Sequence, residues 1–129
     1  MKNNLFSAVL ILICFASFGQ DVKEIASNTL NATVAIFMQD NSNQLKSLGS
    51  GVILDDNLIV TNFHVIDGSY NGYIKLNNSN NQLKIDGYVN IDKTNDLALI
   101  KVSGVISKGI QINKSALAIG ESVYASGNP

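Results

Sequence analysis

The sequence has 129 residues, enough for one small domain, and its basic and acidic side chains nearly balance at a formal net charge of −1, with no arginine. So weak and mixed a charge excludes nucleic acid or an anionic membrane surface as the main partner, because both require a basic patch. The single cysteine, Cys14, lies near the N-terminus, so the rest of the chain has no disulfide framework.

Residues 1–19 have the pattern of a secretory signal peptide. Lys2 supplies a positive start, residues 5–18 are almost wholly apolar, and small residues precede a cleavage point after Gly19. The apolar run is short for a membrane span, and the residue before Cys14 is too large for a lipoprotein signal. We therefore expect an exported bacterial protein, periplasmic or secreted, with an uncleaved N-terminal anchor as the alternative.

The remaining chain predicts strands almost throughout. A polar lead-in over 20–32 can hold a short helical turn around Val22 and Ile25. Asp55 and Asp56 join two strands as a hairpin, and Gly87 indicates a bulge within another. The expected strands cover residues 33–38, 48–54, 57–62, 73–76, 83–91 and 97–102, with a loop at 77–81.

Six short strands about ten residues apart, bounded by Asn, Asp and Gly, predict an all-β barrel or sandwich. The barrel is favoured because the strands are short and apolar on more than one face. We expect residues 33–102 to form this barrel. We expect residues 103–129 to be a connector that leads into one further strand at 121–125. This strand would begin a second β-structure of which the sequence holds only the start.

Two ionisable side chains lie at the ends of strongly apolar strands. His64, the single histidine, follows the third strand, and Asp96 precedes the sixth. An aspartate at the start of an apolar strand is expected to be partly buried and to need a hydrogen-bond donor, which an imidazole N–H provides. This pair is what nucleophilic acyl transfer needs, since a serine hydroxyl reacts only when a neutral, correctly oriented histidine accepts its proton.

Three segments give this pair a wider context, namely GSGVI at 49–53, VTNFHVI at 60–66 and NDLALI at 95–100. In this order and spacing they resemble the first half of trypsin-like serine peptidases of the HtrA/Deg family. The resemblance implies a chymotrypsin-type fold in which 33–102 is the first of two β-barrels, and LAIGESVYASGNP at 117–129 resembles the entry into the second. It implies that His64 is the general base and Asp96 the orienting carboxylate. Asp92 lies outside the match and ranks behind Asp96.

The chain departs from the family pattern at the nucleophile. The family's serine lies in a Gly-x-Ser-Gly-Gly segment, and no such segment occurs here. The serines after the proposed signal, which all lack that context, are Ser27, Ser42, Ser47, Ser50, Ser69, Ser79, Ser103, Ser107, Ser115, Ser122 and Ser126. We therefore expect the serine, the oxyanion hole and the main substrate pocket to lie beyond residue 129, so these 129 residues alone should not cleave polypeptides, the substrates that the resemblance implies.

Other interpretations remain open. One is a secreted pseudoenzyme that binds polypeptides through a peptidase-like domain without cleaving them. Another is a plain β-barrel scaffold, which predicts that His64 and Asp96 lie far apart. A metal site is not expected, because one histidine without clustered Cys or Glu falls short of the ligands that zinc needs. No cofactor is expected either, since the GSG at 49–51 is too short for a phosphate loop and precedes a strand.

Overall fold

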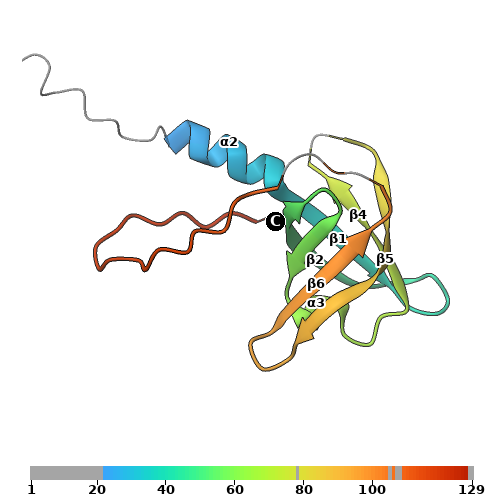
Figure 1. Cartoon of the computed structure of the whole chain (residues 1–129). Coiled ribbons are helices and arrows are strands. Elements are labelled where there is room, and N and C mark those ends of the chain that lie inside the picture. Colours follow the sequence, from blue (N-terminus) through green and yellow to red (C-terminus); the bar gives the residue numbers. More distant parts are fainter. Residues whose placement is uncertain (1–21, 78, 105, 107–108, 128–129) are drawn as a thin grey trace, which may run out of the picture.

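The computed structural model describes residues 22–77, 79–104, 106 and 109–127, and the proposed signal peptide with Cys14 lies outside these residues. Six antiparallel strands form a closed barrel in the order β1-β2-β3-β6-β5-β4 (Figure 1). The strands are β1 Thr33–Gln39, β2 Leu45–Asp55, β3 Leu58–Thr61, β4 Asn71–Leu76, β5 Gln82–Asp92 and β6 Leu97–Val102, and the helices are α2 Val22–Ala32 and α3 Phe63–Ile66. The predicted barrel is confirmed.

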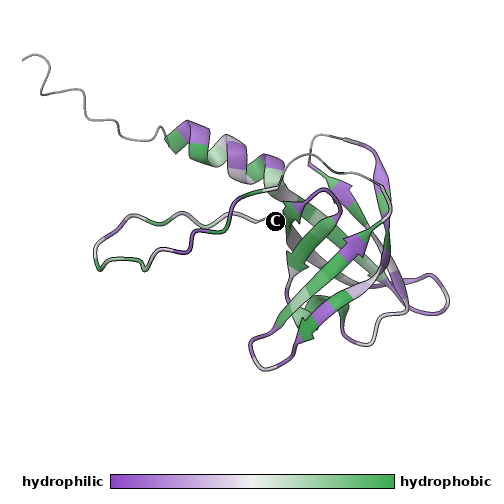
Figure 2. Cartoon of the chain, in the orientation of Figure 1, coloured by the Kyte–Doolittle hydropathy of each residue, from purple (hydrophilic) through white to green (hydrophobic). Residues whose placement is uncertain are grey.

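The barrel interior is filled mainly by branched aliphatic side chains. β1 reads as an almost continuous apolar run because it is buried along nearly its whole length, paired with β2 on one side and β4 on the other. Figure 2 shows hydrophobic residues concentrated along the strands and hydrophilic ones in most of the turns. The isoleucines with no exposed surface are Ile36, Ile53, Ile59, Ile74 and Ile100. These side chains form one core that fixes the strand register.

The predicted hairpin and bulge are both present. β2 pairs with β3 across the turn at Asp56 and Asn57, which satisfies the hairpin prediction. The register between β5 and β6 shifts between Ile85 and Gly87, so β5 carries the expected irregularity there. Such shifts let a long strand bend around a small barrel.

The two helices differ from the sequence-based expectation. α2 has 11 residues where a single turn was expected, and Thr29 Oγ1 donates a hydrogen bond to Ile25 O within it. α3 was not predicted, because four residues are too few to show helical periodicity. Neither of these helices, the two found among the described residues, is long and apolar enough to cross a membrane.

The structure contains no strand at 121–125, where the first strand of a second barrel was predicted. Among the described residues after Val102 the structure contains no strand, although Ile110 N donates a hydrogen bond to Ile53 O at 3.0 Å. This tail forms a long excursion away from the barrel and returns close to β2 (Figure 1). Because a β-strand requires a neighbouring strand for its backbone groups, an apolar run without such a neighbour does not become one.

Candidate active site

His64 lies on α3, at one end of the barrel. Asn62 precedes the helix in an extended conformation, with φ −78° and ψ 145°. Within α3, Val65 and Ile66 are buried in the barrel core, whereas the side chain of His64 is 71% exposed. The local sequence therefore separates two roles, since the apolar residues anchor the helix and the imidazole is left at the surface.

Asp96 ends the turn between β5 and β6. Its backbone is left-handed, with φ of 54°, a conformation that aspartate adopts more readily than most residues. Asp92 begins the same turn, and its carboxylate accepts hydrogen bonds from Asn95 N at 3.1 Å and Asn95 Nδ2 at 2.6 Å. The carboxylate of Asp92 is thus engaged within its own turn, while that of Asp96 is directed to α3.

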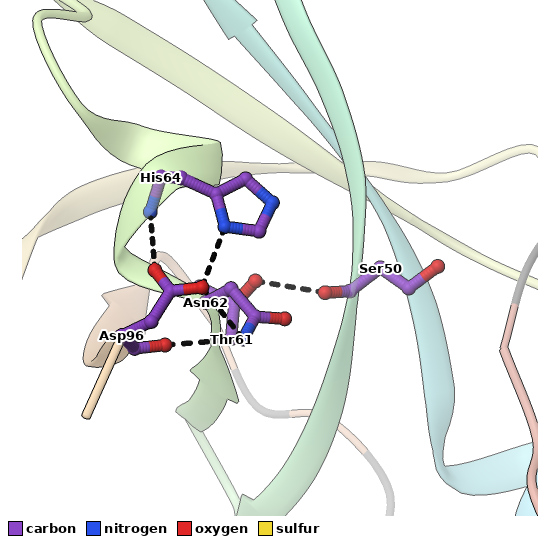
Figure 3. Close-up of polar contacts among 5 residues, drawn as sticks. All are labelled: Ser50, Thr61, Asn62, His64 and Asp96. Atoms are coloured by element: carbon purple, nitrogen blue, oxygen red, sulfur yellow. Dashed lines mark hydrogen bonds and ion pairs between the residues drawn. The ribbon is translucent and has the colours of Figure 1, made fainter.

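The structure brings His64 and Asp96 together (Figure 3). His64 Nδ1 lies 2.6 Å from Asp96 Oδ2, and the backbone N–H of His64 donates to Asp96 Oδ1 at 2.9 Å. Asn62 Nδ2 donates to the main-chain oxygen of Asp96 at 3.0 Å and to Oδ2 at 3.3 Å, and Phe63 N donates to the same main-chain oxygen at 3.1 Å. The two side chains are therefore held at hydrogen-bond distance, the opposite of what the plain scaffold interpretation predicts.

These contacts also set the charge of the carboxylate. Hydrogen bonds from the backbone N–H and then the ring of His64 hold the pKa of Asp96 below its ordinary value. An ionised carboxylate only accepts hydrogen bonds, so the proton of a neutral His64 ring resides on Nδ1 and Nε2 is the acceptor. The hydrogen bonds from the Asn95 side chain and backbone likewise lower the pKa of Asp92.

Asn62 contributes to the site without having been assigned a role from the sequence. Its amide contacts both the backbone and the carboxylate of Asp96, so it restrains the orientation of that side chain. No local signal points to this role, because the helix that follows Asn62 has only four residues and cannot be detected from the sequence. The hydroxyl of Thr61 donates to Ser50 O at 2.7 Å, which ties β3 to β2 directly before this position (Figure 3).

The acceptor nitrogen of the imidazole, Nε2, has no hydrogen-bond partner among the residues that the structure describes. Within that part of the chain, no three His, Cys, Asp or Glu side chains cluster as a metal site would require.

A cation–π contact also joins the β5–β6 turn to α3. Lys93 Nζ lies 5.0 Å from the ring centroid of Phe63, the residue next to His64.

Comparison with known proteins places the fold and these motifs in one family. The family described as "Trypsin-like peptidase domain" matches residues 49–129. The chain therefore belongs to the trypsin-like peptidase domain family. Its curated relatives include probable periplasmic serine endoproteases of the DegP-like kind, so the predicted resemblance to HtrA/Deg peptidases is confirmed.

The individual relatives are bacterial. The chain is 35% identical over 92 residues to a "Probable periplasmic serine endoprotease DegP-like" of Pseudomonas savastanoi pv. phaseolicola, covering 70% of this chain and 19% of that protein. It is 28% identical over 97 residues to the "Magnetosome formation protease MamE" of Magnetospirillum gryphiswaldense, covering 72% of this chain and 13% of that protein. The chain thus spans less than one fifth of the length of these curated relatives.

A solved structure supports the same assignment. The crystal structure of the serine endoprotease from Yersinia pestis superimposes with a TM-score of 0.66 and 25% sequence identity. The similarity covers 81% of this chain and 38% of that protein's chain. Most of this chain therefore has a structural counterpart in a serine endoprotease.

Proposed function

We propose that His64 and Asp96 are the general base and the orienting carboxylate of a serine endopeptidase whose nucleophile is none of the serines in this chain. The observation that carries the proposal is the 2.6 Å separation of His64 Nδ1 and Asp96 Oδ2, with Nε2 unpartnered among the described residues. A histidine held in this tautomer by a carboxylate is what serine activation requires.

The chemistry follows from this geometry. Nε2 of His64 accepts the proton of a serine hydroxyl as its oxygen attacks the carbonyl carbon of a peptide bond. The Asp96 carboxylate stabilises the imidazolium that forms, and the imidazolium then donates its proton to the leaving amine. This chain contributes His64, which transfers the proton, and Asp96, which orients the imidazole. The nucleophile and the oxyanion-stabilising groups come from residues outside this sequence.

We propose that the serine lies in sequence following residue 129, with residues 33–102 as the first of two barrels and 103–129 as the connector. Two observations support this. The chain has no Gly-x-Ser-Gly-Gly segment, and it spans only 38% of the Yersinia pestis chain that it resembles. The substrates are polypeptides in the bacterial periplasm or outside the cell, as the names of the DegP-like relatives suggest for those proteins.

Two samples test the proposal. The 129-residue chain should neither cleave unfolded casein nor react with a fluorophosphonate probe. The polypeptide extended by the coding sequence that follows should do both, and His64→Ala should reduce its kcat/KM by roughly 10⁴-fold or more. Asp86→Asn, a change at an exposed carboxylate on β5, is the matched control and should leave the rate unchanged.

Two results would contradict the proposal. Casein cleavage by the 129-residue chain that depends on His64 would show that the nucleophile is present after all. An extended polypeptide that binds casein but resists both the probe and cleavage would favour the pseudoenzyme alternative.

A further inference from the structure

The position of α3 depends on its packing against the barrel. The helix has four residues, far below the length at which a helix is stable by itself, and the Asn62 side chain makes no cap hydrogen bond to it. Val65 and Ile66 fix it by packing into the core that β1, β2 and β6 also line. The place of the His64 ring is therefore set by how closely the buried side of α3 approaches these strands.

Gly49 on β2 lies directly against Val65 of α3. A Cβ atom added there would lie 2.6 Å from Val65 Cγ2 and 2.7 Å from Val65 Cγ1, well inside van der Waals contact. The backbone of Gly49 is not left-handed, so glycine is not required for its conformation. The neighbouring valine is what excludes a side chain, and the nearly complete burial of Val65 leaves that side chain no open space to turn into.

We propose that Gly49 is a positioning residue for His64. Because Gly49 has no side chain, α3 packs close enough to β2 for the imidazole to reach Asp96. Clearing the overlap from 2.6 Å to an ordinary contact of 3.4 Å requires a movement of about 0.8 Å. His64 contacts Asp96 through both its backbone N–H and its ring, at 2.9 and 2.6 Å, so a displaced α3 loosens both hydrogen bonds together.

The catalytic consequence rests on the proposed function. A misplacement of about 1 Å in a catalytic group can cost on the order of 10²-fold in rate. Gly49→Ala should therefore lower kcat of the extended polypeptide by about that factor. The geometric part of the proposal does not need a nucleophile and can be tested on the 129-residue chain.

Gly51 supplies the matched control. It lies two residues from Gly49 and therefore on the same face of β2. A Cβ atom added there would lie 2.6 Å from Ile59 Cγ2 and 2.8 Å from Ile36 Cδ1, an equally severe overlap that involves β3 and β1 but not α3. Gly51→Ala thus imposes a similar steric load on the barrel without pushing on the helix that carries His64.

The experiment measures the Nδ1 proton of His64 by NMR, at a low-field position typical of a histidine bonded to a carboxylate. The chain has a single histidine, so the signal needs no assignment among several. We expect the wild-type chain to show it and Gly49→Ala to lose it. Gly51→Ala should keep it even though its melting temperature falls by a similar amount. The double variant Gly49→Ala/Val65→Ala, which removes both offending methyl groups, should regain it.

Three outcomes would overturn the proposal: an unchanged signal in Gly49→Ala, loss of the signal in folded Gly51→Ala, or no recovery in the double variant. If Gly49→Ala alone does not fold, the double variant decides the matter. The result is also separable from the proposed function. If the signal responds as expected while the extended polypeptide is never labelled by a fluorophosphonate, the positioning role stands and the peptidase assignment falls.

Discussion

The barrel and the tail that follows it are both rich in apolar residues, yet they fold differently. Residues 97–102 form β6, with Ala98, Ile100 and Val102 buried between two neighbouring strands. In the tail, Leu117 is 70% and Val123 73% exposed, and no strand forms among the described residues there. The difference shows that a neighbouring strand, more than apolar composition, decides whether a segment of this chain becomes a strand.

The largest expected effect contrasts one substitution in the two regions. Ile36→Ala removes a fully buried side chain from the barrel core and should lower the free energy of unfolding by about 2–5 kcal/mol. Ile119→Ala removes a fully exposed side chain from the tail and should change it by less than about 0.5 kcal/mol. Urea unfolding of both variants measures the difference, and equal losses would show that the tail is packed against the barrel in solution.

A smaller effect is expected where the tail joins the barrel. A Cβ atom at Gly109 would lie 2.3 Å from the carbonyl carbon of Leu54, and a backbone atom cannot move aside as a side chain can. Gly109→Ala should therefore detach the tail, break the hydrogen bond from Ile110 N to Ile53 O and cost about 1 kcal/mol. Hydrogen exchange measures this, with faster exchange at the Ile110 amide and unchanged protection in β1. Continued protection of Ile110 would refute it.

The smallest effect concerns the carboxylate of Asp96. Its side chain is partly exposed to solvent, but unlike the tail it is held in place by hydrogen bonds. Because the folded pKa of Asp96 is lowered, the stabilisation from its hydrogen bonds is fully present above the unfolded pKa of about 3.9. It is lost as the pH falls through the still lower folded pKa. The stability difference between wild type and Asp96→Asn should therefore shrink as the pH falls below the unfolded pKa of about 3.9. Urea unfolding across this range measures it, and a difference that grows on acidification would contradict the pKa shift.

The sequence predicted the strands well because their patterns are local. Apolar runs bounded by Asn, Asp and Gly mark the strands of the barrel, and Gly87 marks the bulge. α3 was missed because a four-residue helix has no periodicity to detect. The strand predicted at 121–125 is not formed here, because its apolar run has no partner strand among the described residues, and a single sequence does not reveal which segments find a partner.

The site was predictable only in part. His64 and Asp96 could be named from their places at strand ends and from the motifs around them. The left-handed backbone of Asp96 and the double contact of Asn62 could not, since they depend on where the β5–β6 turn meets α3. The overlap between Gly49 and Val65 likewise appears only when two segments sixteen positions apart are packed together.

The order of strands around the ring has a consequence for the nascent chain. β6 lies between β3 and β5, so the wall closes only when residues 97–102 have left the ribosome. Until then the edges of β3 and β5 have no partner strand, and much of the aliphatic interior is exposed to solvent. Partly folded chains with such exposed edges and apolar surface tend to associate with one another. Folding of this barrel is therefore governed by contacts distant in sequence, and it should be slow for a domain of its size.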